Sequence, residues 1–121
     1  MRGLVTHPGD LLPLKPDVFL VLTVVARGEQ YGYGIMQEAE RVTEGRVRLQ
    51  PGALYRRLRW MLDAGLIEEM DERPVPVDED DDRRRYYAIT DFGRAVARAE
   101  ADRMRSLLRT AEGVGVVGEP R

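Results

Sequence analysis

The spacing of hydrophobic residues predicts three helices in the first half of the chain. Residues 16–26 are apolar on nearly every side, which is typical of a helix buried on more than one side. A second helix follows residue 34, and its apolar face is formed by Ile35, Ala39 and Val42. A third helix begins at Pro51, and its inward stripe is formed by Leu54, Leu58, Met61 and Leu62. Two short helices with a short link between them predict a helix-turn-helix.

The second half of the chain predicts two strands and a long helix. Residues 66–70 and 84–89 are the strands, and the long stretch between them contains Pro74 and Pro76, so the tip of the hairpin is irregular. Thr90 is a good cap for a last helix that runs to about Glu112. The order of these elements predicts a mainly α fold with a small β-hairpin. This is a winged helix-turn-helix followed by one C-terminal helix.

The last helix has two apolar stripes, one through Val96 and Leu107 and the other through Met104 and Leu108. One stripe can cover its own domain, whereas the other needs a partner, which a two-fold dimer supplies. Because Leu107 and Leu108 lie on different stripes, we do not expect both to face the same core. The residues expected in the dimer contact are Val18, Leu22, Val96, Met104, Leu107 and Leu108.

Composition narrows the classes of function. The 121 residues correspond to about one domain, and the absence of cysteine excludes disulfides, thiolate metal sites and cysteine nucleophiles. The one histidine, His7, lies in a segment without periodicity, so neither a histidine metal site nor a Ser–His–Asp triad is expected. No stretch is long and apolar enough to span a membrane, and the chain does not open with a secretory signal. We expect a cytoplasmic protein that is not an enzyme and has no cofactor, no metal and no membrane partner.

Charge is unevenly distributed along the chain. The formal net charge is −2. Residues 46–59 nevertheless contain five arginines and no acid, whereas residues 71–85 contain seven acids and four arginines. Local charge decides which partner a surface attracts, because salt screens exposed charges beyond about 8–10 Å. The overall charge therefore does not exclude binding to DNA.

Four motifs occur in one order along about three-quarters of the chain. They are YGYGI at residues 31–35, LQPGALYRRL at residues 49–58, AGLI at residues 64–67 and RYYAIT at residues 85–90. In these motifs the chain resembles the PadR family of bacterial transcription regulators, in its short form with a single C-terminal helix. The resemblance implies a homodimeric regulator of the repressor type that binds double-stranded DNA at a pseudo-palindromic operator. It also implies a response to a small molecule or a cellular signal.

The resemblance and the predicted elements together divide the chain into four parts. Residues 1–14 are expected to form a flexible N-terminal arm, and residues 15–90 the winged helix-turn-helix that binds DNA. Residues 91–112 are expected to form the C-terminal dimerisation helix, and residues 113–121 a disordered tail.

The helix that begins at Pro51 is the expected recognition helix. Small residues at its start, Gly52 and Ala53, allow it to approach the floor of the major groove. Arg56 is the expected base contact, since a bidentate arginine–guanine pair is the commonest specific contact. Tyr55 is either a phosphate-binding hydroxyl or an aromatic residue at the edge of the core. The arginines expected to contact phosphate are Arg46, Arg48, Arg57 and Arg59, with Arg83, Arg84 and Arg85 at the base of the wing.

Several features have alternative interpretations. The wing arginines could merely neutralise the neighbouring acids of the run at residues 78–82, a run that also resembles a divalent-metal site. Trp60, the one tryptophan, either stacks on a planar effector or packs half-exposed against the fold. The main alternative function is a winged-helix module for protein–protein contact without sequence-specific DNA binding, since a fold does not prove a function. A metal-dependent hydrolase is a more distant third hypothesis.

Overall fold

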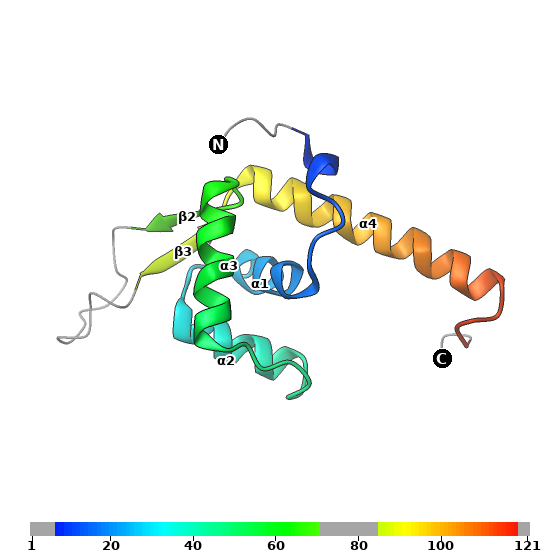
Figure 1. The fold of residues 1–121 in the computed structure, drawn as a ribbon, viewed down its shortest axis with the longest axis horizontal. Coiled ribbons are helices and arrows are strands. Elements are labelled where there is room, and N and C mark those ends of the chain that lie inside the picture. Colours follow the sequence, from blue (N-terminus) through cyan, green and yellow to red (C-terminus); the bar gives the residue numbers. More distant parts are fainter. Residues whose placement is uncertain (1–6, 71–84, 119–121) are drawn as a thin grey trace.

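The computed structural model describes residues 7–70 and 85–118 (Figure 1). A 3₁₀ helix, η1 (Pro8–Leu11), precedes helix α1 (Pro16–Ala26), the short strand β1 (Gln30–Tyr31) and helix α2 (Gly32–Val42). Helix α3 (Pro51–Asp63), strands β2 (Ile67–Met70) and β3 (Tyr86–Ile89), and the long helix α4 (Asp91–Gly113) follow. Helices α1 and α3 begin where predicted, α2 begins at Gly32 and not after residue 34, α4 extends one residue beyond the expected end, and η1 was not predicted.

The sheet has three strands, not the two of a simple hairpin. All neighbours are antiparallel in the order β1-β3-β2, with Tyr31 opposite Tyr86 and Ile67 opposite Ile89. Strand β1 was not predicted, because two residues are too few to show an alternating pattern. The small sheet joins the start of α2 to the base of the wing, and the rings of Tyr31 and Tyr86 lie 5.5 Å apart between centroids.

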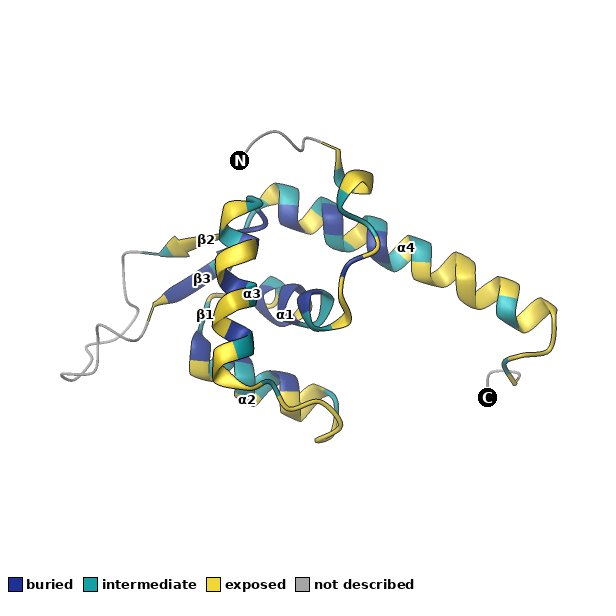
Figure 2. Ribbon diagram, viewed as in Figure 1, coloured by how far each residue is buried: buried dark blue, intermediate teal, exposed yellow. Residues whose placement is uncertain are grey.

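Helix α1 forms the centre of the hydrophobic core. Five of its residues are buried, on more than one side, as its apolar sequence predicts. Ile35 and Ala39 of α2 and Leu54, Leu58 and Met61 of α3 pack into the same core. Figure 2 shows these buried positions gathered where the helices meet. One expectation fails here: Val42, placed on the apolar face of α2, is exposed because it lies at the last residue of that helix.

The boundaries of the helices have local causes. Pro16 and Pro51 occupy first-turn positions, where the missing N–H costs no hydrogen bond. Gly65 follows α3 with a φ of +80°, a conformation that glycine adopts without steric penalty. Thr90 caps α4, since its Oγ1 accepts a hydrogen bond of 2.9 Å from the backbone N–H of Gly93.

Gly93 also fixes how α4 packs on the sheet. A Cβ atom at this position would lie 2.1 Å from the carbonyl oxygen of Leu66, the residue before β2. The absence of a side chain therefore allows the first turn of α4 to approach the backbone directly. This close approach sets the angle at which α4 leaves the winged domain.

The described part of the segment before α1 packs against the fold, whereas residues 1–6 of the expected N-terminal arm lie outside the described residues. Leu14 is buried, and Leu11 and Leu12 pack partly buried against the core. The first residue described, His7, is exposed. The leucines of this segment follow neither a helical nor a strand period, so their burial could not be predicted from spacing. The η1 segment lies across α4, as Figure 1 shows.

A buried carboxylate links this segment to α4. Glu100 is 2% exposed, and its two oxygens accept hydrogen bonds from Nε and Nη2 of Arg103 at 2.7 and 2.8 Å. These bonds, with a contribution from the backbone of Leu14, lower the pKa of Glu100 although burial opposes the shift. The charged pair therefore holds residue 14 against the helix.

The second half of α4 projects beyond the rest of the molecule. The buried residues of this helix are Gly93, Val96 and Glu100, all in its first half. Figure 2 shows the remainder almost entirely exposed. Met104, Leu107 and Leu108 are among these exposed residues, with Leu107 at 56% and Leu108 at 49%.

Candidate nucleic-acid interface

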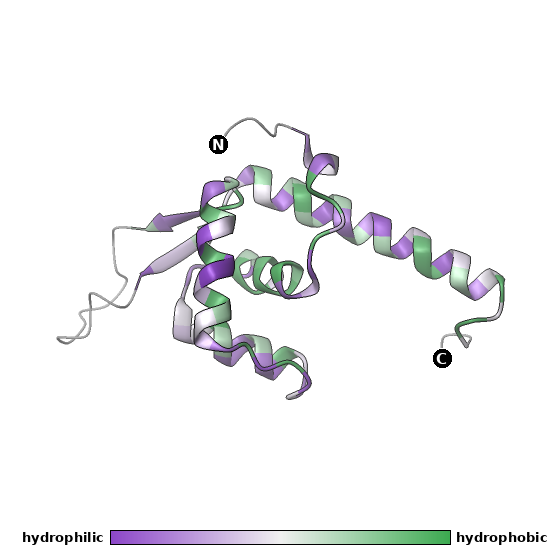
Figure 3. Cartoon of the chain, in the orientation of Figure 1, coloured by the Kyte–Doolittle hydropathy of each residue, from purple (hydrophilic) through white to green (hydrophobic). Residues whose placement is uncertain are grey.

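Helix α3 presents a polar, positively charged face to solvent. Tyr55, Arg56 and Arg59 are exposed, whereas Leu54, Leu58 and Met61 face the core. Figure 3 shows the contrast between strongly hydrophilic bands on α3 and the nearly continuous hydrophobic surface of α1. Gly52 is exposed and Ala53 is partly exposed at the start of the helix, so these two positions carry no large side chain of their own.

Arg56 and Arg59 are two exposed cations of this face that have no acidic partner in the described part of the chain. Neither makes an ion pair with any residue that the structure describes. Arg56 lies along the helix, with one terminal nitrogen 3.6 Å from the position that a Cβ atom of Gly52 would take. The charge of Arg59 acts to lower the pKa of the Tyr87 hydroxyl, against the larger effect of burial, which raises it. Two unpaired guanidinium groups on an exposed helix suit recognition of an anionic partner.

Arg57 was expected to contact phosphate, and the structure gives it another role. Its Nε donates a hydrogen bond of 2.8 Å to Oδ2 of Asp17 in the first turn of α1. Its side chain thus points toward α1 and away from the exposed face. Arg57 points this way because it comes three residues after Leu54 and so lies next to the buried stripe of α3. Arg57 thus joins two helices through Nε, and its expected contact with phosphate stays a prediction.

Tyr55 lies over the start of α2. A Cβ atom at Gly32 would come within 2.3 Å of the Tyr55 hydroxyl, so this ring occupies the space that glycine leaves open. The side chain is nevertheless 44% exposed. Both interpretations of Tyr55 therefore remain compatible with its position, since it packs at the edge of the core with its ring accessible. The role of Gly32 as the seat for this ring is a feature that the sequence analysis missed.

The loop before α3 carries two exposed arginines with weak partners. Arg46 lies 3.8 Å from Glu44, and Arg48 lies 3.6 Å from Glu40, measured between side-chain nitrogen and oxygen atoms. All four side chains are about half exposed or more. Exposed ion pairs of this kind contribute about 0–1 kcal/mol to stability. The arginines can therefore exchange these carboxylates for phosphate with little loss of free energy.

At the base of the wing, only Arg85 lies in the described part of the chain. Its Nη1 donates a hydrogen bond of 2.8 Å to Oε2 of Glu69 on the neighbouring strand. Arg83, Arg84 and the acidic run at residues 78–82 lie outside the described residues. Burial raises the pKa of Tyr87 on β3, and the charge of Glu69 raises it further.

The residues expected in a dimer contact fall into two groups. Val18, Leu22 and Val96 are buried within a single chain, at 2%, 0% and 0% exposure, so we correct their assignment to core residues. Val18 and Leu22 were misplaced because a helix that is apolar all round does not indicate which side faces a partner. Met104, Leu107 and Leu108 stay accessible on the projecting half of α4. Leu107 and Leu108 are both exposed, so neither covers its own domain.

The described residues offer neither a metal-binding cluster nor a membrane-spanning helix. No cluster of three or more histidine, aspartate or glutamate side chains in residues 7–70 and 85–118 could hold a metal ion. In the same ranges, no helix is both long and apolar enough to cross a membrane.

Comparison with known proteins identifies related folds. A family model described as the transcriptional regulator PadR-like family matches residues 21–99. No curated protein matches the chain.

Solved structures similar to this chain include three bacterial regulators. A transcriptional regulator from Clostridium thermocellum is 20% identical, with 86% of this chain and 99% of that chain covered and a TM-score of 0.66. A PadR family transcription regulator from Clostridium difficile is 23% identical, with coverage of 80% and 95% and a TM-score of 0.63. A PadR-like regulator from Bacillus cereus is 22% identical, with coverage of 84% and 92% and a TM-score of 0.64. At these identities the likeness shows the fold.

Proposed function

Because the chain belongs to the PadR-like family of transcriptional regulators, we propose that it binds a specific double-stranded DNA operator as a homodimer and represses transcription there. The recognition element in this proposal is α3. We retain residues 15–90 as the DNA-binding unit and residues 91–112 as the dimerisation helix.

The observation that carries the proposal is the exposed basic face of α3. Arg56 has no acidic partner among the described residues, and the small residues before it leave the helix start open. In a helix-turn-helix the N-terminal residues of the second helix read base edges in the major groove. We therefore assign Arg56 to base contact, with Gly52 and Ala53 permitting the close approach.

Phosphate contacts would surround this helix. Arg59 on α3, Arg46 and Arg48 before it, and Arg85 just before β3 are all exposed. Contacts of this kind position a protein on the duplex without reading its sequence. Arg83, Arg84, the hydroxyl of Tyr55 and the terminal nitrogens of Arg57 complete the proposed set.

The homodimer is supported by the projecting half of α4. Met104, Leu107 and Leu108 expose apolar side chains on a part of the helix that packs against nothing in its own described fold. A second copy of the same helix would cover these residues, and two-fold assembly is the commonest solution for such a surface. Two recognition helices related in this way would read a pseudo-palindrome whose half-sites lie about 10 bp apart or a multiple of it.

Repression and an effector response extend the same proposal. A dimer that occupies an operator within a promoter excludes other proteins from that DNA. A small molecule that binds one state of the dimer better than the other would shift this occupancy.

Selection of bound sequences from a pool of random duplexes tests the proposal directly. We expect an enriched pseudo-palindrome, bound by the purified full chain with strong dependence on salt. Selection with an Arg56→Ala variant in parallel provides the control, since it should lose preference at one position of each half-site. Recovery of no common sequence would reject the proposal in favour of a winged-helix module for protein contact.

A further inference from the structure

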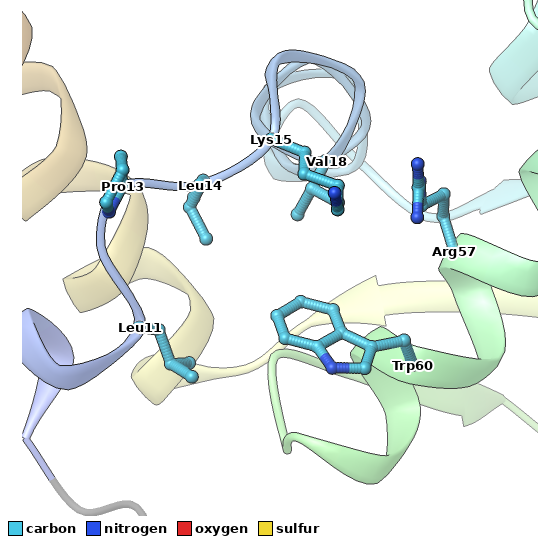
Figure 4. Close-up of a pocket in the computed structure, with 7 residues that line it drawn as sticks. All are labelled: Leu11, Pro13, Leu14, Lys15, Val18, Arg57 and Trp60. Atoms are coloured by element: carbon cyan, nitrogen blue, oxygen red, sulfur yellow. The ribbon is translucent and has the colours of Figure 1, made fainter.

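A hollow of about 260 Å³ lies between the segment before α1, the start of α1 and the outer side of α3. It is lined by Leu11, Pro13, Leu14, Lys15, Val18, Arg57 and Trp60. Figure 4 shows the indole of Trp60 forming one wall, with Leu11, Leu14 and Val18 around it. This hollow exists only because residues 8–15 pack against the fold.

The lining favours a molecule with an apolar, planar body. Five of the seven lining residues are Leu11, Pro13, Leu14, Val18 and Trp60, which offer no charged group. Trp60 is 43% exposed in the single chain, so one face of its ring is open to a ligand. Aromatic rings stack on one another in offset arrangements that strengthen binding beyond the burial of their area.

The remaining two lining residues favour a negative charge on the ligand. Lys15 is exposed and makes no ion pair within the described residues, and no acidic side chain lines the hollow. Arg57 uses Nε for Asp17, while its terminal nitrogens make no hydrogen bond to any described residue. Figure 4 shows Lys15 and Arg57 on the side of the hollow near α1, within the same lining as the indole.

We propose that this hollow is a binding site for a small amphipathic anion, with a planar apolar body against Trp60 and its charge toward Lys15 and Arg57. Pockets that take drug-sized molecules measure about 300–1,000 Å³, so the ligand is smaller than these. The proposal goes beyond DNA binding and does not depend on it. Because Arg57 and Trp60 both belong to α3, the occupant contacts the proposed recognition helix directly.

The test compares two probes of similar shape and different charge, the anion naphthalene-1-sulfonate and its neutral analogue naphthalene-1-sulfonamide. Trp60 is the one tryptophan, so a ¹⁵N-labelled full chain gives a single indole N–H resonance that reports from the wall of the site. We expect the sulfonate to shift this resonance in a saturable manner and to bind more tightly than the sulfonamide. The expected difference is about twofold to fivefold, the effect of one partly exposed charge pair.

Two variants and two matched controls localise the binding by calorimetry. Trp60→Ala should weaken binding of the sulfonate by about tenfold or more, because it removes the aromatic ring on which the ligand stacks. Lys15→Gln should weaken binding of the sulfonate by about twofold to fivefold and leave the affinity for the sulfonamide unchanged. Tyr33→Ala removes an exposed aromatic elsewhere, and Arg98→Gln an exposed cation elsewhere, so both should bind as the unaltered chain does. Far-UV circular dichroism checks that each variant is folded.

Three results would overturn the proposal. The first is equal binding of the sulfonate and the sulfonamide to the unaltered chain. The second is unaltered sulfonate binding by folded Trp60→Ala. The third is an indole resonance that does not shift when the sulfonate is added but shifts with protein concentration. A second copy of the chain would then cover Trp60. All measurements are made without DNA, so failure of the operator selection leaves this test unaffected.

Discussion

Arg57 on α3 and Asp17 in the first turn of α1 form a hydrogen-bonded ion pair, with 2.8 Å between Nε and Oδ2. The two residues are 40 positions apart in the sequence, so the pair fixes how α3 lies against the start of α1. Their side chains are 37% and 28% exposed, so solvent screens this pair less than the fully exposed pairs elsewhere. Among the three arginines of α3, Arg57 is therefore the one that supports the fold.

Replacing Arg57 by alanine should lower the free energy of unfolding by about 1 kcal/mol, a value discounted for the partial exposure of the pair. Arg56→Ala is the matched control on the same helix and should change stability by less than about 0.5 kcal/mol. Urea unfolding followed by circular dichroism measures both. In an Asp17→Ala background, Arg57→Ala should cost less than it does alone. Equal losses in the two backgrounds would show that the pair does not couple the helices.

Arg56→Ala should weaken binding to the selected operator by about 1–3 kcal/mol and relax preference at one base pair of each half-site. Arg48→Ala provides the comparison, because loss of a phosphate contact should weaken all sequences similarly and lower the salt dependence by about one unit. Fluorescence anisotropy on the operator and on its single-base variants separates the two patterns. If Arg56→Ala kept the full sequence preference, another surface would have to read the bases.

Gly93→Ala should destabilise the protein by about 1–3 kcal/mol, because its Cβ would collide with the backbone oxygen of Leu66, which cannot rotate away. Gly113→Ala, in the same helix, meets nothing within 4 Å and should be neutral or slightly stabilising, by up to about 1 kcal/mol. Thermal unfolding of the two variants side by side measures the contrast. A Gly93→Ala protein as stable as the unaltered chain would mean that α4 does not approach β2 this closely.

Leu107→Glu and Leu108→Glu should each weaken the proposed dimer by about tenfold or more, since both side chains are exposed on α4 and a dimer would bury the new charge. This revises the expectation that one of the two faces its own domain. Val114→Glu alters an exposed apolar residue just beyond α4 and serves as the control. Analytical ultracentrifugation over a range of concentrations gives the dissociation constants. A dimer insensitive to both leucine substitutions would have to use another surface.

The Glu100–Arg103 pair makes part of the stability dependent on pH. The pKa of Glu100 is lowered in the folded chain from its ordinary value of 4.5, chiefly by its hydrogen bonds to Arg103. A lowered pKa favours the folded state above pH 4.5, and this contribution is lost as the pH falls through the folded-state value. We therefore expect Glu100→Gln to be less stable at pH 7 and to lose less stability than the unaltered chain on acidification. Urea midpoints at pH 7 and pH 3 test this, and parallel losses in both proteins would contradict it.

The sequence predicts those parts of this protein that depend on neighbouring residues. The turn at Gly65, the cap at Thr90 and the stripe through Leu54 and Leu58 are all set by residues a few positions apart. The two-residue strand β1 could not be predicted, because its pairing with Tyr86 and Tyr87 depends on residues more than 50 positions away.

The candidate site shows the same division between local and distant causes. The exposure of Arg56 follows from helical periodicity, whereas the inward orientation of Arg57 depends on Asp17, 40 positions earlier. The burial of Val18 and Leu22 within one chain could not be separated from burial in a dimer, since both require the same apolar side chains. The hollow beside Trp60 likewise depends on the packing of residues 11–15, which has no periodic signal.

The packing of residues 8–20 has a practical consequence for any minimal fragment of this protein. The family match covers residues 21–99, and a fragment trimmed to that span would omit Leu14, Asp17 and Val18 at one end and Glu100 at the other. Such a fragment would leave Arg57 without its carboxylate and open the core beside α1 to water. A stable fragment is therefore expected to extend beyond the matched span, from Leu11 or earlier to Glu100 or later.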